Sequence, residues 1–348
     1  MKRPAFALAF ALVAATAFAQ APPEPKNVQI LKGMSNAQLI RTMQFMSASL
    51  GVSCDFCHVR TADNHLDAAA DTKEEKKTAR QMIQLVIDTN TKFFNGNTEV
   101  SCETCHRGST NPVSVPVLPI AMNEPAPANE TAAKPAQPAR DEVLTRYTKA
   151  LGNVDAAALT TVELKGTRDT QQGSAPFDVI VAPGRMRSTS TMQNGETVTV
   201  VNGTNGWMRD AKGTRTLQPN QIETANGVAE AYRLTLPSDI PGNAFTHRMA
   251  VDGKQYDVII YRPSPATRVR LYFDPATGLL DKRITLTQSP VGMIPQETDF
   301  SDYRDVNGVK LPFTVKVQTV DPRAGATRHY SDIKLNAKVD DKDFGEPK

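Results

Sequence analysis

The sequence is poor in cysteine and tryptophan and carries almost no net charge. Its 348 residues include four Cys, five His and one Trp, and the formal net charge is +3. Two of the positive charges, Lys2 and Arg3, lie at the extreme N-terminus. A chain this close to neutrality lacks the excess of basic residues that binds phosphate backbones, so we expect no nucleic-acid partner.

Long apolar runs are also missing outside the first 20 residues, MKRPAFALAFALVAATAFAQ. This segment begins with basic residues, continues as an apolar run and ends with small residues, which is the layout of a secretory signal peptide. The apolar run is shorter than the roughly 20 residues that span a bilayer. We therefore predict a signal peptide at 1–19 and a periplasmic protein, with an uncleaved membrane anchor as the alternative.

All four cysteines lie in two pentads of the form Cys-x-x-Cys-His. On a helical turn, residues i, i+3 and i+4 project from one side. Two thiols so placed can each add to one vinyl group of a haem, while the imidazole can bind the iron. This spacing is the attachment signature of c-type haem. The pentads therefore predict two covalently bound haem c groups, with thioethers and proximal iron ligands supplied by Cys54, Cys57, His58, Cys102, Cys105 and His106.

Zinc and disulfides are the alternatives for the same cysteines. Two Cys-x-x-Cys pairs can together bind one zinc ion, but Cys57 and Cys102 are further apart than the usual ribbon gap. Exported thiols also tend to oxidise before they bind zinc. Disulfides within each pair are typical of redox proteins with a βαβ pattern, and no such pattern surrounds these pairs.

Each pentad follows a segment of helical periodicity that carries methionine. Residues 35–50 begin with the capping-box pair Ser35 and Gln38, and residues 72–94 begin with the corresponding pair Thr72 and Glu75. In the second segment, the pattern places Met82 on the inward face with Ala79, Val86 and Phe93. As distal iron ligands we predict Met43 for the first haem and Met82 for the second, with Met46 and His65 as alternatives; the competing role of each methionine is core packing.

The remainder of the chain differs in composition and in its predicted secondary structure. Residues 113–142 are rich in proline and read as a linker. Beyond it, one helix is expected at 141–151 and another at 219–235. Seven β-like runs separated by Asn-Gly, Asp-Gly and Asp-Pro turns follow the linker: 159–164, 177–181, 197–201, 256–261, 268–273, 283–287 and 313–317. This pattern predicts an antiparallel β-rich half-barrel with helices, an α+β domain over residues 143–348.

Three stretches of the N-terminal third resemble the cytochrome c subunit of photosynthetic reaction centres: "LKGMSNAQLIRTMQFMSASLGVSCDFCHV", "KKTARQMIQLVIDTN" and "VSCETCHRG". The resemblance implies a small, mostly α dihaem cytochrome c domain over residues 26–112. It also implies electron transfer and, as a partner, a membrane-associated redox complex. The family's full-length subunits carry four haem motifs, whereas this chain has two.

The C-terminal part resembles the periplasmic lipoprotein-carrier fold in "ALTTVELKGT", "LYFDPATGLLDKR" and "DYRDVNGVKLPF". That resemblance implies an apolar groove and an apolar or lipid-like ligand. The sequence as a whole thus predicts a two-domain dihaem cytochrome that carries single electrons between donor and acceptor proteins. The alternatives are a dihaem peroxidase or other oxidoreductase with one open iron, and a sensing or binding protein in which haem is structural.

The predicted haem domain has fewer than 90 residues and a polar composition, so its own core is marginal. Two covalently held macrocycles would add the missing apolar surface. We therefore predict that residues 26–112 fold only with haem. Expression without cytochrome maturation, followed by thermal melting monitored by circular dichroism, tests this; a cooperative melt of the haem-free segment would contradict it.

Overall fold

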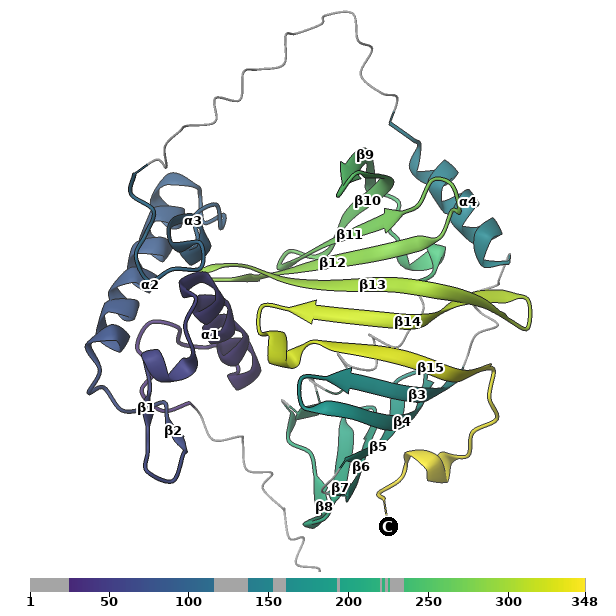
Figure 1. The fold of residues 1–348 in the computed structure, drawn as a ribbon, viewed down its shortest axis with the longest axis horizontal. Coiled ribbons are helices and arrows are strands. Elements are labelled where there is room, and N and C mark those ends of the chain that lie inside the picture. Colours follow the sequence, from purple (N-terminus) through teal and green to yellow (C-terminus); the bar gives the residue numbers. More distant parts are fainter. Residues whose placement is uncertain are drawn as a thin grey trace, which may run out of the picture.

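The computed structural model describes residues 25–115, 137–152, 161–192, 195–219, 221–222, 225 and 235–347. The predicted signal peptide, most of the predicted linker and most of the helix expected at 219–235 lie outside these residues. Figure 1 shows a group of helices beside one large sheet. Among the described residues, no helix combines the length and the apolar composition needed to cross a membrane.

The helical part contains both pentads. Its elements are α1 (Asn36–Leu50), η1 (Cys54–Phe56), β1 (Val59–Arg60), β2 (Leu66–Asp67), α2 (Glu74–Phe93) and α3 (Cys102–His106). The start and end of α1 are as predicted. Ser35 and Gln38 form the capping box, and Gly51 ends the helix in the left-handed conformation.

The capping box predicted for the second helix is wrong. Helix α2 begins at Glu74, and its N-cap residue is Lys73, which makes no side-chain capping bond. Lys73 Nζ instead donates to the backbone carbonyls of Asp55 and Phe56 in the first pentad. The chain before α2 is thereby tied to the pentad, and the helix starts later than the local signal suggests.

The inward face predicted for α2 is also wrong in part. Its buried residues are Lys76, Ile83, Val86 and Asn90. Met82 is 40% exposed and Phe93 is 67% exposed, although both were expected to face inward. The buried stripe is rotated because two polar residues, Lys76 and Asn90, turn inward and bond to backbone groups of neighbouring loops.

The rest of the chain forms one 13-stranded antiparallel sheet in the order β8-β7-β6-β5-β4-β3-β15-β14-β13-β12-β11-β10-β9. Strands β8 and β9 are its open edges, and the strands fan through a large angle between them (Figure 1). The strands are β3 (Val162–Thr170), β4 (Gly173–Ala182), β5 (Arg185–Met192), β6 (Gly195–Asn202), β7 (Asn205–Asp210), β8 (Gly213–Thr216), β9 (Phe245–Val251), β10 (Lys254–Ser264), β11 (Thr267–Phe273), β12 (Leu280–Ser289), β13 (Gly292–Val306), β14 (Val309–Thr319) and β15 (Ala326–Leu335).

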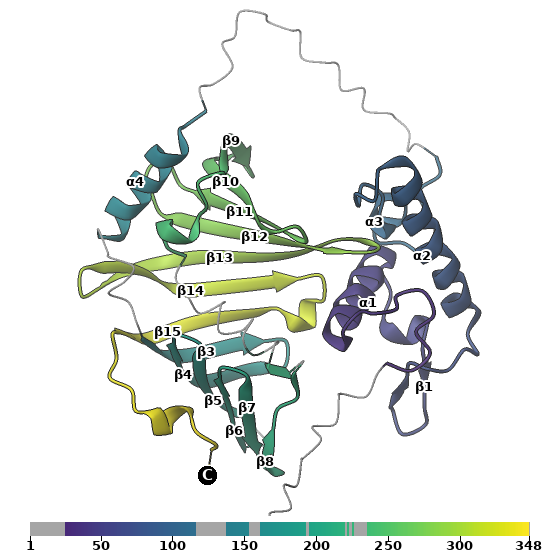
Figure 2. The same cartoon turned by 180° about the vertical axis from the view of Figure 1, so that it is seen from behind.

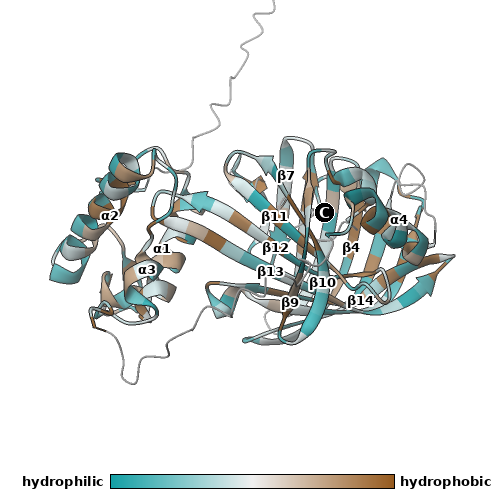
Figure 3. Cartoon of the chain, turned by 90° about the horizontal axis from the view of Figure 1, so that it is seen from above, coloured by the Kyte–Doolittle hydropathy of each residue, from teal (hydrophilic) through white to brown (hydrophobic). Residues whose placement is uncertain are grey.

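The predicted antiparallel sheet is confirmed. Six of the seven predicted runs lie within strands, and the run at 159–164 overlaps β3 from Val162, while residues 159–160 lie outside the described part of the chain. Six strands were missed: β5, β7, β8, β9, β13 and β15. They are polar along much of their length, as in "RMRSTSTM" and "GTRT". Figure 3 shows polar and apolar residues interspersed along the strands, as expected for a sheet with one packed face.

Helix α4 (Arg140–Leu151) packs on the sheet near β10 and β11 (Figures 1 and 2). Tyr147 is fully buried, its ring meets Phe273 edge-on, and its hydroxyl donates to the Thr235 carbonyl at 2.7 Å. The helix expected at 141–151 is confirmed, and it ends at Gly152 as predicted. A second core lies between β3, β4, β14 and β15 and is formed by residues such as Leu164, Phe177, Leu311, Phe313 and Tyr330.

A buried ion-pair cluster joins α4 to the sheet. Asp257 on β10 is fully buried and accepts hydrogen bonds from Arg146 on α4 and from Arg248 on β9. Burial alone would raise the pKa of Asp257, but the two guanidinium groups hold it below the usual 3.8. The stabilisation is therefore complete above about pH 4 and is lost as the pH falls through the lowered pKa.

We predict that Asp257→Asn lowers the free energy of unfolding by about 3–5 kcal/mol at pH 7, because it leaves two arginines without their buried counter-ion. The control is Asp341→Asn, whose carboxylate pairs with Arg185 but is 96% exposed; it should change stability little. Urea unfolding at pH 7 and at pH 3 measures both effects. Equal losses in the two variants would contradict the prediction.

Candidate haem site

Both pentads form helical turns, as the spacing predicts. Helix α3 consists of the second pentad alone. The first pentad is the short helix η1 continued by one α-type bond, in which the His58 N–H donates to the Cys54 carbonyl at 3.0 Å. In each pentad the two cysteines and the histidine therefore project from one side of a turn.

The histidine of the second turn has a defined tautomer. His106 Nδ1 lies 2.9 Å from the Ser109 carbonyl oxygen. A carbonyl only accepts, so the proton sits on Nδ1 and Nε2 keeps a free lone pair. A ligating histidine usually makes such a bond through its other nitrogen, which fixes the ring. His106 thus has the geometry of a preoriented iron ligand.

The histidine of the first turn has a lowered pKa. Burial, and next the charge of Lys76, lowers the pKa of His58. A neutral imidazole is the form that binds metals, so this direction fits a haem ligand. Its Nδ1 is buried without a hydrogen-bond partner, so His58 lacks the bond that fixes the ring of His106.

The apolar surface of the helical part also fits a haem. Nine large hydrophobic side chains are exposed in the described residues, and eight of them lie between positions 40 and 115. They are Ile40, Phe56, Met82, Leu85, Phe93, Phe94, Val113 and Val115. An exposed apolar patch normally marks a binding site. Two apolar macrocycles bound beside the pentads would cover such a surface.

All four cysteines are unpaired. Burial raises the pKa of Cys57 and raises the pKa of Cys102 to about 11. Within the described residues, no three His, Cys, Asp or Glu side chains gather at metal-binding distance. A zinc site built from the four cysteines is therefore not assembled in this arrangement.

The candidate distal ligands lie in different environments. Met46 is 7% exposed and packs with Phe45 and Cys102, so it fills the core. Met43, one turn earlier on α1, is half-buried at the edge of the same cluster. Met82 faces outward on α2, and His65 is exposed in the turn between β1 and β2. The assignment of all four as ligands stays a prediction.

Lys76 is a site residue that the sequence did not reveal. It is 8% exposed, and its ammonium group donates to the carbonyls of Ala68, Ala69 and Ala70 at 2.7–3.1 Å. It also pairs with Asp71 at 2.8 Å. These bonds close the loop that follows the first pentad. A lysine within a helical pattern reads as a surface residue, so no local signal marked this role.

Asn90 has a comparable role at the second pentad. Its side-chain oxygen accepts from the backbone of Glu99 and Val100, and its side-chain nitrogen donates to the Val100 carbonyl at 2.7 Å. Asn90 is 4% exposed, so these bonds are protected from water. They hold the loop that leads directly into Cys102.

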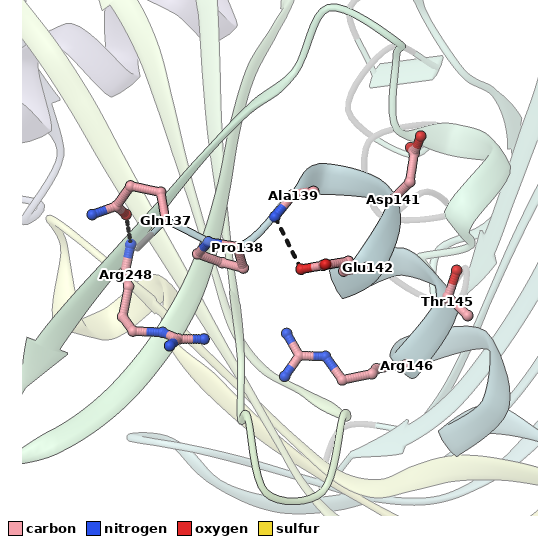
Figure 4. Close-up of a pocket in the computed structure, with 8 residues that line it drawn as sticks. All are labelled: Gln137, Pro138, Ala139, Asp141, Glu142, Thr145, Arg146 and Arg248. Atoms are coloured by element: carbon pink, nitrogen blue, oxygen red, sulfur yellow. Dashed lines mark hydrogen bonds between the residues drawn. The ribbon is translucent and has the colours of Figure 1, made fainter. Parts of the chain in front are cut away.

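The sheet also carries a pocket of about 920 Å³ at the start of α4 (Figure 4). Six of its eight lining residues are polar or charged, and they include Glu142, Arg146 and Arg248. This pocket is not the apolar groove that the resemblance implies for the C-terminal part. Its two arginines are already engaged by Asp257.

Comparison with known proteins confirms the resemblance of the N-terminal part. Residues 11–150 match the family model of the photosynthetic reaction centre cytochrome C subunit. Cytochrome c-554 of Chloroflexus aurantiacus is 40% identical over 105 residues, which cover 28% of this chain and 24% of that protein.

Two reaction-centre subunits also match this chain. The photosynthetic reaction center cytochrome c subunit of Rubrivivax gelatinosus is 28% identical over 105 residues, covering 29% of this chain and 27% of its own length. That of Thermochromatium tepidum is 37% identical over 92 residues, covering 25% and 21%. The chain therefore spans about a quarter of the length of the curated relatives it matches.

Among solved structures, a LolA superfamily protein from Nitrosomonas europaea matches with a TM-score of 0.38 and 12% identity, covering 60% of this chain and 97% of its own. A putative outer membrane lipoprotein-sorting protein domain from Vibrio parahaemolyticus has a TM-score of 0.37 and 10% identity, covering 58% and 94%. Both similarities are weak.

Lys76 and its neighbour Lys77 offer a matched test of the first loop. Lys76→Met should lower the free energy of unfolding by about 2 kcal/mol, since it leaves three part-buried carbonyls without their charged donor. Lys77 pairs only with Glu74 and its side chain is 50% exposed, so Lys77→Met should have little effect. Urea unfolding of the haem-loaded protein compares the two, and equal stability of the variants would contradict the assignment.

Proposed function

We propose that residues 26–112 form a dihaem c-type cytochrome that carries single electrons, joined by a linker at 113–142 to a β-rich domain at 143–348. Cys54, Cys57 and His58 would hold the first haem. Cys102, Cys105 and His106 would hold the second. The iron of each haem supplies the one-electron redox change, while the chain holds and orients the group and limits its contact with water.

One observation carries this proposal: both pentads are helical turns, and His106 has its Nδ1 proton bound by the Ser109 carbonyl at 2.9 Å. That bond leaves Nε2 as the only nitrogen able to bind iron. The lowered pKa of His58 and the exposed apolar side chains between positions 40 and 115 support the same interpretation.

The proposed distal ligands are Met43 for the first haem and Met82 for the second. The half-buried position of Met43, beside the core that Met46 fills, supports this choice over Met46. Met82 projects outward from α2 among other exposed apolar side chains, where a bound haem would cover it. His65 is the alternative for the second haem.

The proposed partners are electron donor and acceptor proteins, a membrane-associated redox complex among them, outside the cytoplasm. The names of the matched relatives from Rubrivivax gelatinosus and Thermochromatium tepidum support such a complex. An apolar or lipid-like ligand of the β-rich domain gains no support. Side chains of α4 cover the sheet near β10 and β11, and the pocket at the start of α4 is lined mostly by polar residues.

A second function follows if the exposed Met82 does not bind iron, because the second haem would then have an open coordination position. In that case the protein is a dihaem peroxidase or another oxidoreductase. Binding of carbon monoxide by the reduced protein at one haem would favour this function. Its absence at both haems favours the electron carrier.

We predict that the mature protein carries the mass of two haems and gives a c-type haemochrome spectrum. Met43→Ala and Met82→Ala should each convert one haem from low spin to high spin, because each removes one sulfur ligand. Met46→Ala is the control: it should lower stability through the cavity it creates and leave the visible spectrum unchanged. Unchanged low-spin spectra in both ligand variants would contradict the methionine assignment.

A further inference from the structure

The end of the β12–β13 hairpin lies against the helical part, far from the rest of its sheet. Strand β12 ends at Ser289, β13 begins at Gly292, and Figures 1 and 2 both show this end reaching α1 and α3. The hairpin is distant from both pentads in the sequence. Its contacts are therefore a property of the tertiary structure alone.

Val291, in the turn of this hairpin, is buried among residues of the helical part. It is 0% exposed and belongs to the same apolar cluster as Leu31, Phe45, Met46, Ile83 and Cys102. The sheet thus contributes a core residue to the helical part. Removing this residue would leave a cavity beside the first cysteine of the second pentad.

The backbone of the hairpin also approaches the helices closely. A Cβ on Gly292 would collide with the Phe45 ring and would lie 3.1 Å from Ser101 Cβ, so only glycine fits there. The Ser289 hydroxyl donates to the Gly292 carbonyl at 2.8 Å and fixes the turn. The hairpin end is therefore shaped to fit against α1 and the start of α3.

A hydrogen bond connects the hairpin to the pentad itself. The Cys102 N–H donates to the Val291 carbonyl at 3.4 Å. This N–H is in the first turn of α3, where a helix has no acceptor of its own. The hairpin thus supplies a partner for the residue that begins the second attachment turn.

Helix α1 has a second connection to the sheet. Asp321, after β14, accepts from Gln44 of α1 at 3.1 Å and from the guanidinium of Arg323 at 2.8–2.9 Å. Asp321 is 9% exposed, although the Arg323 side chain is 61% exposed. This contact ties α1 to the sheet, whereas the Val291 carbonyl bonds to a residue of the second pentad itself.

We propose that the hairpin end, residues 289–292, positions the second haem attachment turn, so that the redox potential of the haem held there depends on the C-terminal sheet. This inference rests on the proposed haem-binding function. It assigns Val291 as a positioning residue: Val291 acts through α1 and α3 and supplies no ligand to the iron. A potential depends on ligand geometry and burial, and both would change if the turn loosened.

The test compares Val291→Ala with Val179→Ala in the haem-loaded, full-length protein. Val179 on β4 is equally buried (0% exposed) but belongs to the separate core between β3, β4, β14 and β15. Two quantities are measured: the hydrogen-exchange rate of the Cys102 amide and the two midpoint potentials. The potentials are assigned with a Cys54→Ser/Cys57→Ser background that keeps only the second haem.

We expect Val291→Ala to increase the hydrogen-exchange rate of the Cys102 amide about tenfold. The free energy lost to a small core cavity corresponds to roughly a tenfold change in an equilibrium constant. Val291→Ala should shift the potential of the second haem more than that of the first, because Val291 bonds directly to Cys102 but reaches the first haem only through α1. Val179→Ala should change neither. If Val291→Ala does not fold, Val291→Thr keeps the shape of the side chain and is measured in its place.

The inference is overturned if Val291→Ala behaves like Val179→Ala, or if both haem potentials shift equally. A protein without haem would disprove the proposed function separately, and its absorption spectrum shows that at once. In that event, the exchange rate of the Cys102 amide still decides whether the hairpin holds the turn.

Discussion

A helical segment of fewer than 90 residues has only a small apolar core with which to hold two attachment turns in place. This constraint explains the arrangement of the N-terminal part. Its described core is a small cluster, and one of its six buried members, Val291, comes from the sheet. Eight large hydrophobic side chains between positions 40 and 115 remain exposed. The helical part thus takes one core residue from outside its own helices, and we predict that haem supplies further apolar surface.

Buried polar residues add hydrogen bonds that hold the loops beside the two pentads in place. Lys76 ties the loop after the first pentad, and Asn90 ties the loop before the second. Both lie on the inner face of α2, which therefore serves as a common support for the two turns. Each polar group is paired, so its burial does not carry the cost of an unmade hydrogen bond. The same principle operates in the sheet, where Asp257 binds two arginines and fastens α4.

The sequence predicted the features that depend on neighbouring residues. The capping box of α1, the glycine that ends it, the helical pentads, the helix before Gly152 and seven of the strands follow from local spacing and turn chemistry. The cytochrome resemblance rests on the same local motifs. The wrong predictions concern α2, where Thr72 and Glu75 do not form a cap and Met82 does not face inward. In α2, side-chain bonds to carbonyls outside the helix outweighed the local pattern. The spacing of apolar residues gives no information about such bonds. Six polar strands were missed because their pairing depends on neighbours in the sheet more than on their own composition.

The sequence by itself determined the chemistry, because the spacing Cys-x-x-Cys-His acts within a single helical turn and needs no partner from elsewhere in the chain. Tertiary structure decided what surrounds that chemistry. It buried Met46 and exposed Met82, turned a lysine inward beneath a loop, and brought Val291 of the sheet against Cys102. The last of these joins segments that are far apart in the sequence, and each of them depends on contacts between elements rather than on a local pattern. No five-residue pattern contains that information.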